Sequence, residues 1–217
     1  MIDTAQLVQY LFFMIVFLFS LSVHEAAHAW TAEWFGDPTA RYLGRVTLNP
    51  IPHIDLVGTL IFPTLLFFSG GLLFGWAKPV PWNPLHVRDR RKADIWISAA
   101  GPISNLLLLA VFLLGIKVLQ SYQMGGGVID GTILEPLWRM CLLGAILNTA
   151  LAVFNMIPIP PLDGSWILPH FLPRDLAAAY RRIRPYGVII LFVCFYFGVF
   201  GTVLRPFMQF VHWIIAA

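Results

Sequence analysis

The sequence predicts an all-α membrane protein: a polytopic helix bundle of about four full spans plus one re-entrant or additional membrane segment, with short irregular or β-like loops at the membrane. Three observations predict this class. The 217-residue chain is 59% hydrophobic and 12% charged, whereas soluble domains average about 45–50% apolar and about 25% charged residues. Its mean hydropathy is +0.77. Long apolar runs alternate with loops that carry most of the basic residues, which is the pattern that membrane topology imposes.

Four apolar runs are long enough to cross a bilayer, since a spanning helix needs about 20 residues. We predict these spans at residues 7–33, 93–119, 134–157 and 185–203. The tail at residues 207–217 is too short to span, and we expect it to lie in the membrane interface. The first run lacks a small-residue cleavage site, which favours a retained helix over a signal peptide. We expect residues 1–217 to form a single integral-membrane domain.

Basic residues mark three of the loops. They are Arg41 and Arg45 after the first span, Lys78, Arg88, Arg90, Arg91 and Lys92 before the second, and Arg174, Arg181, Arg182 and Arg184 after the third. The positive-inside rule places these loops in the cytoplasm, so that the first and third spans run toward the cytoplasm and the second and fourth away from it. The net charge is only +3, and we expect no nucleic-acid partner.

Residues 56–83 raise a question of parity. The basic loops on either side of this stretch share one side of the membrane only if the stretch crosses an even number of times. We therefore predict that the chain enters at residues 56–74 and returns through the proline-rich residues 76–84. Irregular backbone at membrane depth is tolerated where it is buried in protein or lines a wet cavity. The alternative is a full additional crossing that violates the charge rule.

The sequence HEAAH at residues 24–28 places three ionisable groups inside the first span. On a helix His24 and His28 lie one turn apart on one face, where two imidazoles can share a tetrahedral zinc ion. Glu25 lies beside them, in position to act on a water molecule, as in the H-E-x-x-H arrangement. A charged group at mid-bilayer costs about 2.5–3.5 kcal/mol on insertion scales and persists mainly for function. We therefore predict one zinc ion per chain.

A catalytic zinc needs a third protein ligand. Glu33 is a poor candidate because it lies near the opposite face of the same helix. His53 and Asp55 stay open as candidates, although they follow two prolines. Asp163 is a stronger one, because the prolines of IPIPP end the third span. The first and third spans run in the same direction, so we expect Asp163 and His28 at the same cytoplasmic depth.

Three motifs together resemble the site-2 protease family of intramembrane zinc metalloproteases. They are HEAAH, AAGPISN at residues 99–105 and FNMIPIPPLDG at residues 154–164. The resemblance covers about residues 7–170 and implies zinc ligation by His24, His28 and Asp163, with Glu25 as the general base and Asn155 near the scissile carbonyl. The stretches GRVTLNPIPHIDLVGTL and WAKPVPWNP resemble the short bacterial subgroup that lacks a fused PDZ or CBS domain.

The resemblance implies an intramembrane zinc metalloendopeptidase that hydrolyses peptide bonds in or near transmembrane segments, as in regulated intramembrane proteolysis. The expected partners are a transmembrane or membrane-anchored protein substrate and the lipid bilayer. The expected location is the cell membrane, as a multi-pass protein with its active site near the cytoplasmic side. Two other functions are weighed against this one. A catalytically silent metal-bound scaffold would not need Glu25, and a transporter or metal channel would spread its polar residues along a path instead of at one depth.

Several polar and small residues have an expected supporting role. Asn155 would donate to the developing oxyanion, or alternatively form a hydrogen bond between helices. We expect Asn105 and Asn148 to hold helices together and Gly101 to permit close packing. Because a helical substrate must unwind, residues 40–49 or 78–84 could hold it extended; a simple cytoplasmic turn is the alternative.

Overall fold

The structure is a computed structural model in which residues 3–70 and 75–217 are described. Every regular element in these ranges is a helix, which confirms the predicted all-α class. Four helices are long and apolar enough to cross a membrane: α1 (Thr4–Trp34), α4 (Arg90–Met124), α5 (Leu134–Asn155) and α9 (Val199–Ala216). Shorter helices connect them, namely α2 (Thr39–Tyr42), η1 (Ile51–His53), η2 (Leu56–Ile61), α3 (Phe62–Phe68), α6 (Gly164–Ile167), η3 (Leu168–His170), α7 (Arg174–Ile183), η4 (Arg184–Tyr186) and α8 (Gly187–Tyr196).

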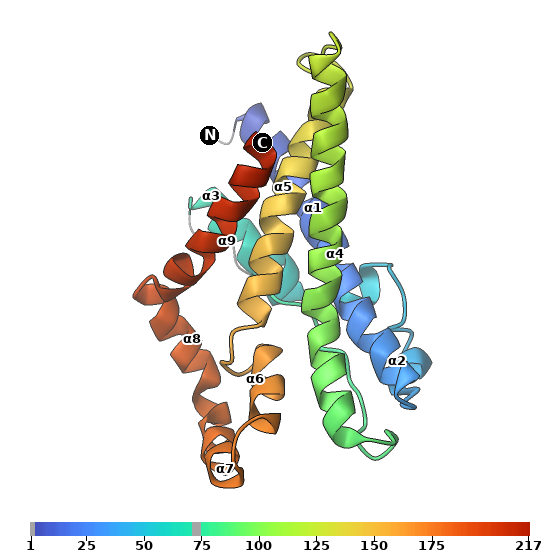
Figure 1. The fold of residues 1–217 in the computed structure, drawn as a ribbon, viewed down its shortest axis with the longest axis vertical. Helices are drawn as coiled ribbons and strands as arrows, with labels where there is room; N and C mark the ends of the chain where they lie inside the picture. The colour runs from blue at the N-terminus through green and yellow to red at the C-terminus, as the bar shows by residue number, and fades with distance from the viewer. Residues whose placement is uncertain (1–2, 71–74) are drawn as a thin grey trace.

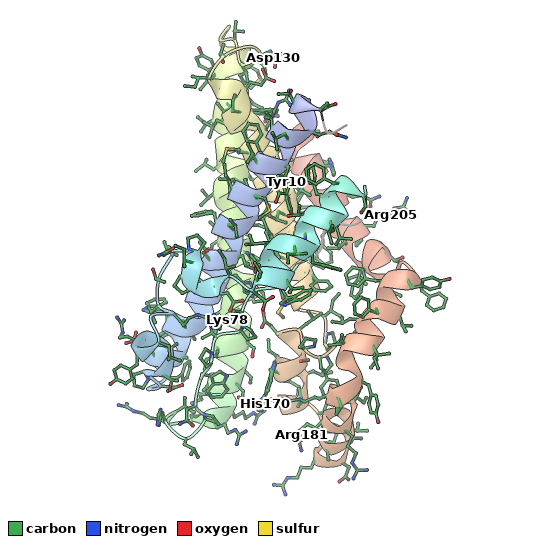
Figure 2. All side chains as sticks on the ribbon, turned by 180° about the vertical axis from the view of Figure 1, so that it is seen from behind. Tyr10, Lys78, Asp130, His170, Arg181 and Arg205 are labelled. Carbon is green, nitrogen blue, oxygen red and sulfur yellow. The ribbon has the colours of Figure 1, made fainter. Side chains whose placement is uncertain are left out.

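The long helices pack around α4, with α1 and α5 against it and α9 beside α5 (Figure 1). Helices α1 and α5 run in the same direction and α4 in the opposite one, as the sequence predicts for the first three spans, and α9 runs with α4. A buried apolar cluster joins α4, α5 and α9 through Ile116, Cys141, Ala145 and Val211. Seen from behind, Asp130 in the turn between α4 and α5 lies at one end of the molecule, and His170 and Arg181 lie at the other (Figure 2).

Residues 56–70 run along α1 toward its N-terminal end, and the chain then returns. The Asp55 side chain caps η2 by accepting a hydrogen bond from the Gly58 N–H, and α3 continues along α1, where Tyr10 bonds Thr64 across 2.7 Å. On the way back, the Trp76 N–H donates to the Gly58 carbonyl over 3.0 Å. This is the geometry that the predicted re-entrant path requires, since the alternative of a full crossing would leave residue 76 far from residue 58. Residues 71–74 of the predicted excursion lie outside the described residues.

The returning segment is fastened to the end of α1 by Asp37. This side chain is fully buried and accepts hydrogen bonds from Thr39, from the Asn83 N–H and from His86. Burial alone would raise the pKa of the Asp37 carboxyl, but these hydrogen bonds outweigh it and lower the pKa below its usual value. In the described ranges, neither residues 40–49 nor 78–84 form a strand: residues 40–42 belong to α2, and the rest of both stretches is irregular instead of β-like.

The last span differs from the prediction. We predicted a span at residues 185–203 and an interfacial tail at 207–217, but the spanning helix is α9, which begins at Val199. Gly198 has a left-handed backbone with φ +69°, which ends α8 and turns the chain. Pro206 lies inside α9 without ending it, as prolines in membrane helices often do. The predicted boundary of the last span is therefore wrong. A single glycine that ends a helix is a weaker sequence signal than a proline.

Candidate metal centre

His24 and His28 lie one turn apart on the face of α1 that is directed toward α4. Both are buried, with exposed fractions of 5% and 8%. Their Nε2 atoms are 3.0 Å apart. This is the shared face that the spacing of four residues predicts for a helix.

Asp163 reaches the two histidines from the connection between α5 and α6. Its Oδ2 atom is 3.2 Å from His24 Nε2 and 3.4 Å from His28 Nε2. The connection folds back sharply at Gly164. A Cβ at this position would lie 2.2 Å from the Met156 carbonyl oxygen, so only glycine fits there. The structure thus brings the three residues singled out as ligands together, with one ligand atom from each within 4.8 Å of the others.

A second contact on each histidine fixes the position of the ring proton. His24 Nδ1 lies 2.6 Å from Asn105 Oδ1, and His28 Nδ1 lies 2.6 Å from the Ile97 carbonyl oxygen. Both partners are acceptors, so in a neutral imidazole each Nδ1 carries the proton and donates it. Each Nε2 then presents its lone pair to the centre. Metal-binding histidines in proteins are commonly oriented by such a bond from the other ring nitrogen.

The donor set of this cluster fits a divalent cation. Two imidazole lone pairs and one carboxylate oxygen face one another at close range, an arrangement that is repulsive unless a proton or a cation lies between them. Asp163 Oδ2 is buried, and no hydrogen-bond partner for it exists among residues 3–70 and 75–217. Two histidines and one carboxylate are a ligand set that catalytic zinc takes, with a fourth position left for water or substrate.

Helix α4 makes room for this centre at Gly101. A Cβ at this position would lie 2.5 Å from His24 Nε2 and 2.5 Å from His28 Nε2. The expected role of Gly101 in close packing is therefore specific: it lets the α4 backbone approach the two ring nitrogens that carry the lone pairs.

Glu25 follows His24 on α1 and is turned about 100° from it around the helix. It is buried, with an exposed fraction of 8%. Arg45 is also buried and donates a hydrogen bond to the Lys78 carbonyl. Burial lowers the pKa of the Arg45 guanidinium, and the nearby Glu25 carboxylate opposes this shift. A buried cation therefore accompanies the candidate base, although the sequence indicated only a topology signal for Arg45.

Asn155 is the last residue of α5, and its side-chain amide donates to the Leu151 carbonyl over 3.0 Å. That bond lies within α5, so it is not the bond between helices that was the alternative to catalysis. Within the described part of the chain, the Asn155 side chain makes no hydrogen bond to the three candidate ligands. The structure does not bring Asn155 into the cluster.

The other candidates for the third ligand are engaged elsewhere. Glu33 forms an ion pair with Arg41. His53 Nε2 lies 2.9 Å from the Thr47 carbonyl oxygen and donates to it. Asp55 caps η2. These three residues therefore support the loops that surround the centre and do not join its ligand atoms.

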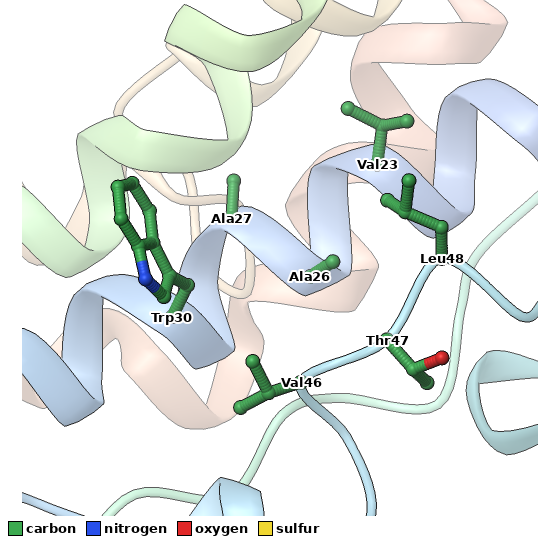
Figure 3. Close-up of a pocket in the computed structure, with 7 residues that line it drawn as sticks. All are labelled: Val23, Ala26, Ala27, Trp30, Val46, Thr47 and Leu48. Carbon is green, nitrogen blue, oxygen red and sulfur yellow. The ribbon is translucent and has the colours of Figure 1, made fainter.

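A surface groove lies between α1 and the chain that follows α2 (Figure 3). Its volume is about 320 Å³, and it is lined by small and apolar residues, namely Val23, Ala26, Ala27, Trp30, Val46, Thr47 and Leu48. In Figure 3, residues 46–48 run past the exposed side of α1. The lining residues of α1 are neighbours of His24, Glu25 and His28 in the sequence and span the same two turns, but they lie on a different face of the helix from the two histidines.

Asn105 touches a candidate ligand, a role that the sequence did not indicate. We expected it only to hold helices together, but it contacts His24 directly. One signal was available: Gly101 and Asn105 are four residues apart and therefore share a face of α4. A glycine and an amide on one face of a spanning helix indicate a close approach to a polar group.

Comparisons with known proteins found relatives along most of the chain. It is 35% identical to "Putative zinc metalloprotease YwhC" of Bacillus subtilis, over 91% of this chain and 86% of the relative. It is 32% identical to "Putative zinc metalloprotease Rip2" of Mycolicibacterium smegmatis, over 90% of this chain and 70% of the relative. It is 29% identical to "Putative zinc metalloprotease Rip2" of Mycobacterium tuberculosis, over 89% of this chain and 71% of the relative. No family model and no solved structure matches.

Proposed function

The chain belongs to the site-2 protease family and is a zinc metalloprotease, and from this premise we propose that it hydrolyses peptide bonds in or near transmembrane segments of membrane proteins. One observation carries the proposal. Two histidines on a spanning helix and an aspartate from a distant loop bring three ligand atoms within 4.8 Å of one another, and the candidate base is the neighbour of one of these histidines. A soluble substrate would not require this chemistry among spanning helices.

We assign one zinc ion to His24, His28 and Asp163. When bound, zinc supplies a Lewis acid that polarises a carbonyl and lowers the pKa of water. The protein contributes the arrangement: the two Nδ1–H bonds keep both Nε2 lone pairs directed at one point, and Gly101 keeps α4 from filling it.

Glu25 acts as the general base and then as the general acid. Its carboxylate takes a proton from the attacking water and returns that proton to the leaving amine. The buried Arg45 guanidinium supplies a positive charge near the Glu25 carboxylate. The Asn155 side-chain amide carries two N–H donors, and one of them is directed to the Leu151 carbonyl. We assign the other donor to the developing oxyanion.

The groove beside α1 is our proposed substrate site. A transmembrane peptide must be held extended for its carbonyls to be reached, and residues 46–48 offer backbone groups along the groove for strand addition. This favours residues 40–49 over 78–84 as the clamp. Leu48→Pro removes one backbone donor and should raise KM, whereas Leu48→Ala tests loss of the side chain alone. Equal effects of the two substitutions would remove the backbone clamp from the proposal.

The decisive experiment compares Glu25→Gln with wild-type protein purified in detergent. Zinc content and cleavage of a helical membrane peptide are measured on the same samples. We expect zinc at one ion per chain in both proteins and a loss of cleavage of about 10²–10⁴-fold in the variant, the usual range for general acid–base catalysis. Full cleavage by Glu25→Gln would refute the mechanism, and cleavage absent from both proteins would favour a metal-bound scaffold.

We propose the cell membrane as the location, with the centre near the cytoplasmic side. The basic residues Arg174, Arg181 and Arg182 follow the loop that carries Asp163, which supports this orientation. The test is thiol labelling of Arg88→Cys in a chain whose two native cysteines are replaced by serine. Labelling by an impermeant reagent should require broken cells. Labelling in intact cells would reverse the orientation.

A further inference from the structure

A chain of buried amides leads from His24 through three helices. Asn105 on α4 lies between His24 on α1 and Asn148 on α5, and its Nδ2 donates to Asn148 Oδ1 over 2.9 Å. Asn148 Nδ2 in turn donates to Ser20 Oγ and to the Gly144 carbonyl, both over 2.9 Å. Both amides and Ser20 are fully buried.

The Gly144 carbonyl sets the direction of every bond in this chain. A backbone carbonyl can only accept, so the NH2 group of Asn148 must face it. The Asn148 oxygen then faces Asn105, which directs the NH2 group of Asn105 toward Asn148. The oxygen of Asn105 is left facing His24. No other orientation of the two amides satisfies all of these groups at once.

This direction decides which ring nitrogen of His24 carries the proton. An oxygen facing Nδ1 requires the N–H at Nδ1 and leaves the Nε2 lone pair for the centre. A flipped Asn105 would present its NH2 group instead, which would move the ring proton to Nε2 and direct it at Asp163. His28 has no such choice, because its Nδ1 faces the Ile97 carbonyl, a backbone group that cannot flip.

We propose that Asn105 and Asn148 are positioning residues that hold His24 in its metal-binding tautomer, with the Gly144 carbonyl as the fixed point of the relay. The inference rests on the proposed zinc site, and it explains why His24 carries its ring proton on Nδ1 and not on Nε2. The two amides therefore differ from ordinary helix–helix contacts, in which the direction of the hydrogen bonds is of no consequence. Here Asn105 must present its oxygen to His24 and its NH2 group to Asn148 on α5.

The test measures zinc affinity by chelator competition in detergent for Asn105→Leu, Asn105→Asp and Ser104→Ala. Asn105→Leu removes the acceptor and should weaken zinc binding by about 10–100-fold, as loss of an outer partner of a ligand typically does. Asn105→Asp keeps an acceptor on His24 and should stay within about threefold of wild type, because carboxylate–histidine–metal pairs are a common arrangement. Ser104→Ala is the matched control, since its buried hydroxyl bonds only within α4, and it should leave the affinity unchanged.

A second readout follows the tautomer itself. Nitrogen NMR of histidine-labelled, zinc-free protein at a pH where the rings are neutral reports which nitrogen of His24 is protonated. Wild type should show Nδ1–H, and Asn148→Leu should show a mixture, because Asn105 is then free to turn. Weak zinc binding by Asn105→Asp equal to that of Asn105→Leu would overturn the relay, as would a pure Nδ1–H form in Asn148→Leu. Zinc missing from the wild type would instead refute the proposed function.

Discussion

His24 and His28 come from a spanning helix, whereas Asp163 comes from a short connection between helices. Each histidine has a second hydrogen bond, to Asn105 or to the Ile97 carbonyl. In the described residues no hydrogen bond of this kind reaches Asp163 Oδ2. The histidine half of the centre is therefore part of the core of the bundle, and the aspartate half is attached to it.

The aspartate half is fixed at its edges. His170 is the last residue of η3, and its Nε2 atom lies 3.0 Å from Asp94 Oδ2 on α4. Its backbone carbonyl accepts a hydrogen bond from Arg91. We call these three residues the α4 clasp. On the other side, the Tyr180 hydroxyl donates to the Pro158 carbonyl over 2.8 Å. Because the two halves are held differently, we expect zinc affinity to depend on both of them and the stability of the zinc-free protein to depend mainly on the histidine half.

The largest expected effect comes from removing one ligand from each half. His24→Ala and Asp163→Ala should each weaken zinc binding by more than about 100-fold, beyond the range seen for outer partners. Their zinc-free stabilities should differ, because His24→Ala leaves the buried Asn105 oxygen without a donor, at a cost of about 1–3 kcal/mol. Asp163→Ala removes one of three facing acceptors and should not lower the stability.

Thermal unfolding in detergent with a chelator present measures this contrast, and competition for zinc measures the affinities. Equal losses of zinc-free stability in the two variants would mean that both halves belong to the core, which would remove the distinction.

An intermediate effect is expected at Gly101, which touches only the histidine half. Gly101→Ala places a methyl group 2.5 Å from both ring nitrogens, so the rings must turn away from the Asn105 and Ile97 acceptors. We expect zinc affinity to fall by at least about 10-fold, comparable to the loss of an outer partner. Gly201→Ala on α9 is the control, since its added methyl group meets open space. Zinc binding by Gly101→Ala at the wild-type level would contradict the close approach of α4.

The smallest effect should come from the α4 clasp. His170→Ala releases the segment after Asp163 without touching a ligand, so zinc affinity should fall by less than the about 10–100-fold expected for a group bonded to a ligand. His212→Ala is a suitable control, because this histidine bonds only to the Met208 carbonyl of its own helix. A loss as large as that of Asp163→Ala would show that the clasp, and not the turn at Gly164, positions the aspartate.

The sequence predicted most of the helices and all three residues that converge, for physical reasons. Apolar length and charge bias are local signals, so α1, α4 and α5 were expected within a few residues of their ends. His24 and His28 were linked by helical spacing, and Asp163 by the direction of the spans. The partners of the ligands were harder to predict. The Ile97 carbonyl has no signature in a sequence, and an amide such as Asn105 does not indicate which of its neighbours it will bond.

Zinc X-ray absorption on the purified protein tests the central claim most directly. If His24, His28 and Asp163 hold the metal, the spectrum should show nitrogen and oxygen neighbours at about 2.0–2.2 Å, including two imidazoles, and no sulfur at about 2.3 Å. In His28→Ala any zinc that remains should show one imidazole fewer. A sulfur neighbour in the wild type, or full zinc with an unchanged spectrum in His28→Ala, would contradict the account.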